Sequence, residues 1–149
     1  MNQFILRRFN GTEIFNVSSA TVTAKQSDEG ISLWFEVETD STAIQRNSDT
    51  ESMGGSPNAS FYLIVNDIEE ITNTNITIPT SYNNELQDYV TTIYYYDHND
   101  INNNIISIKR VDSSSFYVKW NGTTMDCNFY DGSKPETQIE IETIFNLIE

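Results

Sequence analysis

Residues 31–38 read ISLWFEVE, and this stretch decides the fold because apolar and polar side chains alternate along it. Successive side chains of a β-strand point to opposite faces, so one face here is apolar and the other polar. The apolar face carries Ile31, Leu33, Phe35 and Val37, and the opposite face carries Ser32, Trp34, Glu36 and Glu38. The stretch therefore predicts a β-strand with one buried face and one solvated face.

The same period of two recurs in three later stretches, residues 116–120, 125–129 and 138–142. Between the first two lies Asn121-Gly122, the dipeptide that most strongly favours a tight β-hairpin turn. We therefore predict a hairpin there and a meander of about five strands from Tyr89 onward. The last segment, 141–149, fits either a helical or a strand period, and its β-branched residues favour a strand.

Two earlier segments depart from simple alternation. In residues 12–25 the apolar positions change phase, which predicts a bulge or bend near Ser18 and Ser19. Residues 61–65, FYLIV, are apolar on both faces, which predicts a central strand or one that another element covers. The apolar residues of 80–89 recur at helical spacing behind a proline, so we expect a short helix there as the cover.

These patterns predict one all-β, mainly antiparallel domain over residues 1–149, built as a β-sandwich or a partly closed β-barrel. We expect about eight strands and at most one or two short helices. Residues 40–58 are polar, contain Gly54, Gly55 and Pro57, and predict a flexible loop inside this domain.

The net charge of −14 is spread over both halves of the chain. Such a surface repels phosphate backbones and anionic membranes, so we expect no nucleic-acid or membrane partner. It favours a basic protein partner, and solubility alone is the competing explanation. No apolar run reaches membrane-spanning length, and the N-terminus lacks the order of a signal peptide. Together with the single Cys127 this predicts a cytoplasmic protein, with an upstream signal that has been removed as the alternative.

Residues 94–100, YYYDHND, contain His98, the one histidine of the chain. Neighbouring strand residues point to opposite faces, and no second histidine exists, so we expect no metal site here. Asp100, Asn102 and Asn104 alternate as in a calcium loop, but the glycine and the bidentate glutamate that such a loop needs are missing. The composition instead predicts a strand that leaves the core through a polar hairpin, with no metal or cofactor bound.

Outward-facing aromatic residues beside carboxylates give the candidate interface. It consists of Trp34, Glu36, Glu38 and Tyr117. The leading hypothesis is a non-enzymatic acidic binding module for a basic protein, of the immunity or inhibitor type. The alternatives are a small-ligand carrier with an aromatic-lined barrel and an enzyme that uses carboxylates. A large apolar cavity would favour the carrier, and a filled core would favour the binding module.

Overall fold

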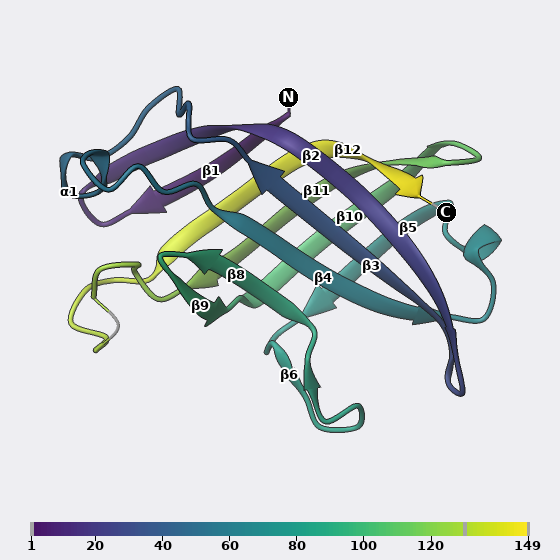
Figure 1. The fold of residues 1–149 in the computed structure, drawn as a ribbon. Helices are drawn as coiled ribbons and strands as arrows, with labels where there is room; N and C mark the ends of the chain where they lie inside the picture. The colour runs from purple at the N-terminus through teal and green to yellow at the C-terminus, as the bar shows by residue number, and fades with distance from the viewer. Residues whose placement is uncertain (1, 130, 149) are drawn as a thin grey trace.

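The computed structural model describes residues 2–129 and 131–148, and within them the chain is almost entirely β-structure (Figure 1). A ten-stranded sheet has the order β5-β10-β11-β12-β1-β2-β3-β4-β8-β9, and β6 and β7 form a separate two-stranded sheet. The strands are β1 (Gln3–Arg8), β2 (Gly11–Ser27), β3 (Gly30–Thr39), β4 (Asn58–Val65), β5 (Asn73–Ile78), β6 (Tyr82–Asn83), β7 (Asp88–Tyr89), β8 (Thr91–Tyr95), β9 (Asp97–Asp100), β10 (Asn102–Asp112), β11 (Ser115–Thr124) and β12 (Thr137–Ile148). The helical elements are α1 (Ser48–Glu51) and the 3₁₀ helix η1 (Ile68–Glu70). The predicted all-β, mainly antiparallel fold is confirmed, and the large sheet is not closed.

The long strand β2 makes the sheet fold over on itself. It pairs with β1 near its start and with β3 further along, and residues 21–23 also run parallel to residues 146–148 of β12. A register shift between Val17 and Ser19 marks the bend, so the predicted bulge is confirmed. As a result β2, β3, β4 and β8 form one layer, and β12, β11, β10 and β5 form the layer behind it (Figure 1).

Aromatic side chains from both layers fill the space between them. Phe35 stacks on Phe61 with ring centroids 4.5 Å apart, and Phe61 meets the edge of Trp120 at 4.9 Å. The indole N–H of Trp120 donates to the side-chain oxygen of Asn104, so its polar group is satisfied. All three aromatic side chains are fully buried, as the alternation predicts for the inward face.

The hairpin predicted at Asn121-Gly122 is wrong, because β11 runs straight through both residues. A Cβ atom on Gly122 would lie 2.5 Å from a methyl carbon of Ile101 and 2.9 Å from the side-chain oxygen of Asn104. The glycine therefore permits close packing and makes no turn. Residues 125–129, predicted as a strand, lie instead in the connection between β11 and β12. The C-terminal segment is a strand, as its β-branched residues predict.

The helix predicted over 80–89 is also wrong, since β6 and β7 form a small hairpin there. Tyr82 and Tyr89 are cross-strand partners with ring centroids 5.0 Å apart, so their spacing reflects a hairpin and no helical face. The expected meander is interrupted as well. Strands β8 to β12 do follow one another, but β9 and β10 are not neighbours in the sheet.

Candidate protein-binding face

The outer face of β3, β4, β8 and β9 carries three of the four residues predicted as an interface. Because Phe35 and Val37 point into the core, Trp34, Glu36 and Glu38 point outward. Strand pairing then sets other side chains beside them in cross-strand rows. The rows are Trp34–Tyr62, Glu36–Ser60–Thr92–Asp100 and Glu38–Asn58–Tyr94–His98. We call this surface the acidic face.

A pair of aromatic rings occupies one end of the acidic face. Trp34 stacks on Tyr62 with ring centroids 4.4 Å apart and an interplanar angle of 29°. Tyr62 is buried, and its hydroxyl donates to a carboxylate oxygen of Asp88 at 3.2 Å. Burial, and then the negative charge of Asp88, raises the pKa of Tyr62 to about 12. The tyrosine is therefore a fixed support on which the half-exposed indole of Trp34 rests.

The other end is a shallow acidic hollow of about 260 Å³. Glu36 and Glu38 form one side of it, and Tyr94 and His98 form the other. The rings of Tyr94 and His98 lie 4.6 Å apart, and both side chains are exposed. Among the described residues that line the hollow there is no lysine or arginine. Glu36 and Glu38 therefore give the hollow its acidic character.

The histidine segment differs in detail from the polar turn that we expected. The chain reverses at Tyr96, which has a positive φ of 64°, and DHND itself forms the strand β9. His98 belongs to the acidic face, whereas Asp97 and Asn99 point to the opposite side of the strand. Asn104, a candidate calcium ligand, is fully buried and hydrogen-bonded to Ile78, Thr91, Ile101 and Trp120. Within the described ranges, no group of three His, Cys, Asp or Glu side chains could hold a metal ion.

Tyr117, the fourth predicted interface residue, lies apart from the other three. It projects from β11, which β12, β1 and β2 separate from β3 in the sheet. Its hydroxyl donates to a carboxylate oxygen of Glu142 on β12, and this bond is the main cause of its raised pKa. Sequence reasoning grouped Tyr117 with Trp34 because both point outward, but a single strand pattern says nothing about which strands are neighbours.

A second group of acidic side chains surrounds the buried Arg8, and sequence reasoning did not identify it. Glu13 and Asp126 are fully buried, and the side chain of Asp49 is 30% exposed. The Arg8 guanidinium makes two hydrogen bonds to Asp126, at 2.9 and 3.0 Å, and two to Asp49, at 2.8 and 2.9 Å. A carboxylate oxygen of Glu13 lies 3.5 Å from it. Burial alone would lower the pKa of Arg8, but the bonds to Asp126 and Asp49 raise it above its usual value. We call Arg8, Glu13, Asp49 and Asp126 the buried charge cluster.

The remaining oxygens of this cluster are also satisfied. Glu13 accepts hydrogen bonds from the backbone N–H of Asn47 and from the hydroxyls of Thr50 and Tyr95. Burial, and then the charge of Glu13, raises the pKa of Tyr95. The cluster fastens residues 47–50 of the long loop to β1 and β2, although the flexibility of the rest of that loop stays a prediction. This arrangement stabilises structure and offers no free group for chemistry.

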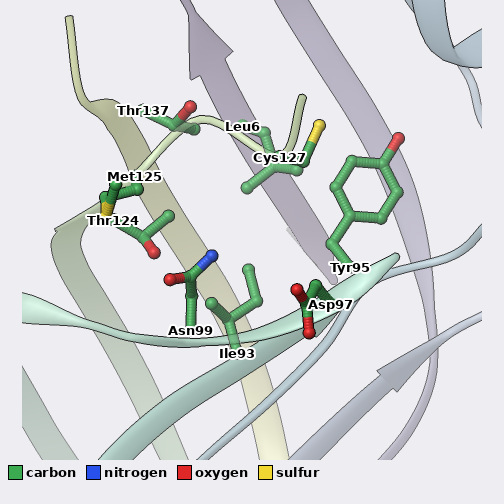
Figure 2. A pocket seen from close by; sticks show the side chains of 9 residues that line it. All are labelled: Leu6, Ile93, Tyr95, Asp97, Asn99, Thr124, Met125, Cys127 and Thr137. Atoms are coloured by element: carbon green, nitrogen blue, oxygen red, sulfur yellow. The ribbon is translucent and has the colours of Figure 1, made fainter. Parts of the chain in front are cut away.

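Cys127 and His98 do not form a catalytic pair. Cys127 lines a small cavity between β1, β8, β9 and the connection after β11, together with Tyr95 and Asp97 (Figure 2). His98 lies on the other side of β9, in the acidic hollow. Burial raises the pKa of the Cys127 thiol to about 12, so at neutral pH the thiol is protonated and a poor nucleophile.

Comparison with protein-family models, with curated proteins and with solved structures found no significant match. Within the part of the chain that the structure describes, no helix is long and apolar enough to cross a membrane.

Proposed function

We propose that the chain is a non-enzymatic binding module that engages a basic protein through the acidic face. The observation that carries the proposal is the position of a supported aromatic ring, Trp34, on the same rigid surface as two exposed carboxylates, Glu36 and Glu38. Aromatic side chains of this kind dominate the energetics of protein interfaces, and carboxylates around them select a cationic partner.

The distribution of charge supports the same partner. The chain carries a net charge of −14, and two of its glutamates lie in the acidic hollow, whose described lining residues include no lysine or arginine. A basic protein would be attracted over a long range and oriented toward this surface. An inhibitor or immunity protein, which must capture a basic target quickly, is one role that suits these properties.

The filled core supports a binding module over the alternative of a small-ligand carrier. The cavity of Figure 2, lined by residues of β1, β8, β9 and the connection after β11, has a volume of about 10 Å³, and the larger groove of about 530 Å³ beside β4 and β5 is open at the surface. The cavity has room for about one water molecule, whereas small-molecule sites are commonly about 300–1,000 Å³. Fully buried aromatic rings occupy the space where a carrier would hold its ligand.

The proposal can be tested on a partner captured from the native host at low salt and then purified. Trp34→Ala should speed dissociation by at least about tenfold, because an anchor holds the complex together after docking. The double substitution Glu36→Gln and Glu38→Gln should mainly slow association and flatten its dependence on salt. Surface plasmon resonance at several salt concentrations measures both rates.

Matched controls separate the acidic face from the charge of the whole protein. Tyr117→Ala removes an outward aromatic ring from the other layer, and Glu69→Gln with Glu70→Gln removes two exposed charges elsewhere. Both controls should leave dissociation unchanged. The proposal would be contradicted if the association and dissociation rates changed neither with salt nor on substitution of Trp34, Glu36 and Glu38. The acidic surface would then serve solubility alone.

A further inference from the structure

The large sheet stays open between β4 and β5, and each strand leaves an edge unpaired there. On the edge of β4 that faces away from β3, pairing with β8 covers residues 58–61, and the N–H of Tyr62 bonds to the carbonyl of Val90. Among the described residues, no strand pairs with residues 63–65 on that side. β5 is the end strand of the sheet, and its one described partner strand is β10. The sheet thus has two free edges in the same part of the molecule.

Alternation along the ladders identifies which backbone groups are free. The backbone N–H and C=O groups of successive residues in an antiparallel strand point to opposite sides. The N–H of Tyr62 points away from β3, so the backbone groups of Ile64, two residues later, point away from β3 as well. On the other side, the carbonyl of Thr72 accepts from Arg110 of β10. The same alternation therefore turns the backbone groups of Asn73, Asn75 and Thr77 away from β10. No backbone partner within the described ranges occupies these positions.

A groove of about 530 Å³ lies between the two edges. Its walls include Leu63 and Ile64 of β4 and Ile76 and Ile78 of β5, all of them half-buried. Leu63, Ile76 and Ile78 also pack against the hydrophobic core, so the groove is where the core is incompletely covered. The hairpin of β6 and β7 contributes further lining residues, from Tyr82 to Leu86. We call this feature the edge groove.

The free edges lack the devices that usually prevent strands from pairing with other chains. Natural edge strands carry lysine, proline, inward-pointing charges or bulges for this purpose. β5 reads NTNITI, without a charge or a proline, and its ladder with β10 shows no register shift. The free half of β4 is uncharged as well. An unprotected edge beside an exposed apolar groove matches the requirements for the addition of a strand from a partner.

We infer that the edge groove accepts an extended segment of a basic protein, which adds as a strand along β5. Alternate apolar side chains of that segment would fill the groove against β4, and the intervening basic side chains would face solvent. Charge selects this occupant. Glu85 lines the groove and Asp88 bonds to Tyr62 at its wall, while no lysine or arginine is among its described lining residues. A second copy of the chain would bring another net charge of −14 to the same surface.

The edge groove shares Tyr62 with the acidic face, but its free edge on β5 lies apart from Glu36 and Glu38 and can be tested independently of them. The probe is a synthetic ten-residue peptide that alternates valine and lysine, titrated into the ¹⁵N-labelled protein. Strand addition should slow amide hydrogen exchange at Asn73, Asn75 and Thr77 by at least about tenfold at saturation, because their N–H groups gain acceptors. Amides of Glu36 and Glu38, which do not line the groove, should keep their exchange rates.

Two control peptides separate strand addition from attraction between opposite charges. A peptide with the same sequence but N-methylated at alternate residues keeps its charge and loses the backbone donors that pair with β5. Its affinity should fall by at least about tenfold, since backbone hydrogen bonds are the main source of affinity in strand addition. A valine–glutamate peptide should not bind. Equal binding of the methylated peptide, or binding without protection of the β5 amides, would overturn the proposal.

A variant tests the groove from the protein side. Asn75→Pro removes an outward N–H and should weaken peptide binding at least about tenfold without breaking the ladder with β10. The melting temperature of the variant shows whether it still folds. If it does not fold, the comparison of the methylated and unmethylated peptides on the unaltered protein still tests strand addition. Sedimentation of the peptide-free protein tests the other candidate occupant of the groove, a second copy of the chain. A dimer that already protects Asn73, Asn75 and Thr77 would show that a second copy fills the groove, and would overturn the assignment to a basic partner.

Discussion

The acidic face and the buried charge cluster contain the same chemical group in opposite surroundings. Glu36 and Glu38 are exposed and make no hydrogen bond or ion pair with the rest of the described chain. Glu13 and Asp126 are fully buried, and Arg8, hydroxyls and backbone N–H groups surround them. A buried carboxylate without partners would strongly destabilise the fold, so its oxygens need hydrogen-bond or ion-pair partners within the protein. A free carboxylate on the surface stays available to another molecule.

The largest expected effect comes from removing the cation of the buried charge cluster. Arg8→Met would leave Glu13, Asp49 and Asp126 close together without a counterion. Breaking a buried ion pair from one side typically costs about 3–5 kcal/mol, and we expect a loss of at least this size in the free energy of unfolding. Urea denaturation followed by tryptophan fluorescence measures it.

Arg7→Met provides the matched control, since Arg7 is the neighbouring residue and also forms an ion pair. Its guanidinium lies 2.7 Å from Glu140, but both side chains are close to half exposed. A pair of this kind contributes at most about 1 kcal/mol. If both substitutions lowered the free energy of unfolding by the same amount, burial would not make the Arg8 ion pairs more stabilising than the exposed pair of Arg7.

A smaller effect should appear in the dependence of stability on pH. Hydrogen bonds from Arg8 lower the pKa of Asp49 below its usual value. The group then stabilises the fold above its unfolded pKa of about 3.9, and this contribution is lost as pH falls through the lowered folded pKa. Asp49→Asn should therefore reduce stability most at neutral pH, and the difference from the unaltered protein should shrink as the pH falls below about 4.

Thermal melts from pH 7 to pH 2 measure this difference. Glu36→Gln is the control, because Glu36 has no hydrogen-bond or ion-pair partner in the described part of the chain, and at neutral pH it should change the melting temperature far less than Asp49→Asn does. A difference for Asp49→Asn that stays constant down to pH 2 would mean that its ion pair with Arg8 does not stabilise the fold.

Local patterns in the sequence predict the parts of the fold that depend on single strands. Alternation identifies the buried face of residues 31–38, and a change of phase locates the bulge after Val17. The same reasoning failed at Gly122, because the glycine is required by the close approach of Ile101, which lies between β9 and β10, and of Asn104 on β10. A turn and a close contact between strands both favour glycine, and local sequence cannot distinguish them.

The candidate sites were predicted only in part, for the same physical reason. Trp34, Glu36 and Glu38 lie on one strand, so their common face follows from the period of two. Tyr94 and His98 join them only through the pairing of β3, β4, β8 and β9, which a single sequence does not specify. Arg8 resembles any charged residue near a turn until residues 49 and 126, far along the chain, are brought against it.

The smallest expected effect concerns stability when the acidic face loses its charge. Glu36→Gln and Glu38→Gln together change the net charge from −14 to −12 and remove no hydrogen bond or ion pair of the described chain. Surface substitutions of this kind usually change the free energy of unfolding by no more than about 0.5 kcal/mol. The sign should be a slight gain at low salt, because self-repulsion of the folded protein decreases, and the gain should vanish in 1 M salt, where screening acts within about 3 Å. Urea denaturation at both salt concentrations gives the two values.

A loss above about 1 kcal/mol would mean that these glutamates help hold the fold together. In that case a slower association of the same variant could no longer be read as a property of a binding surface, and the contrast with the buried charge cluster would disappear.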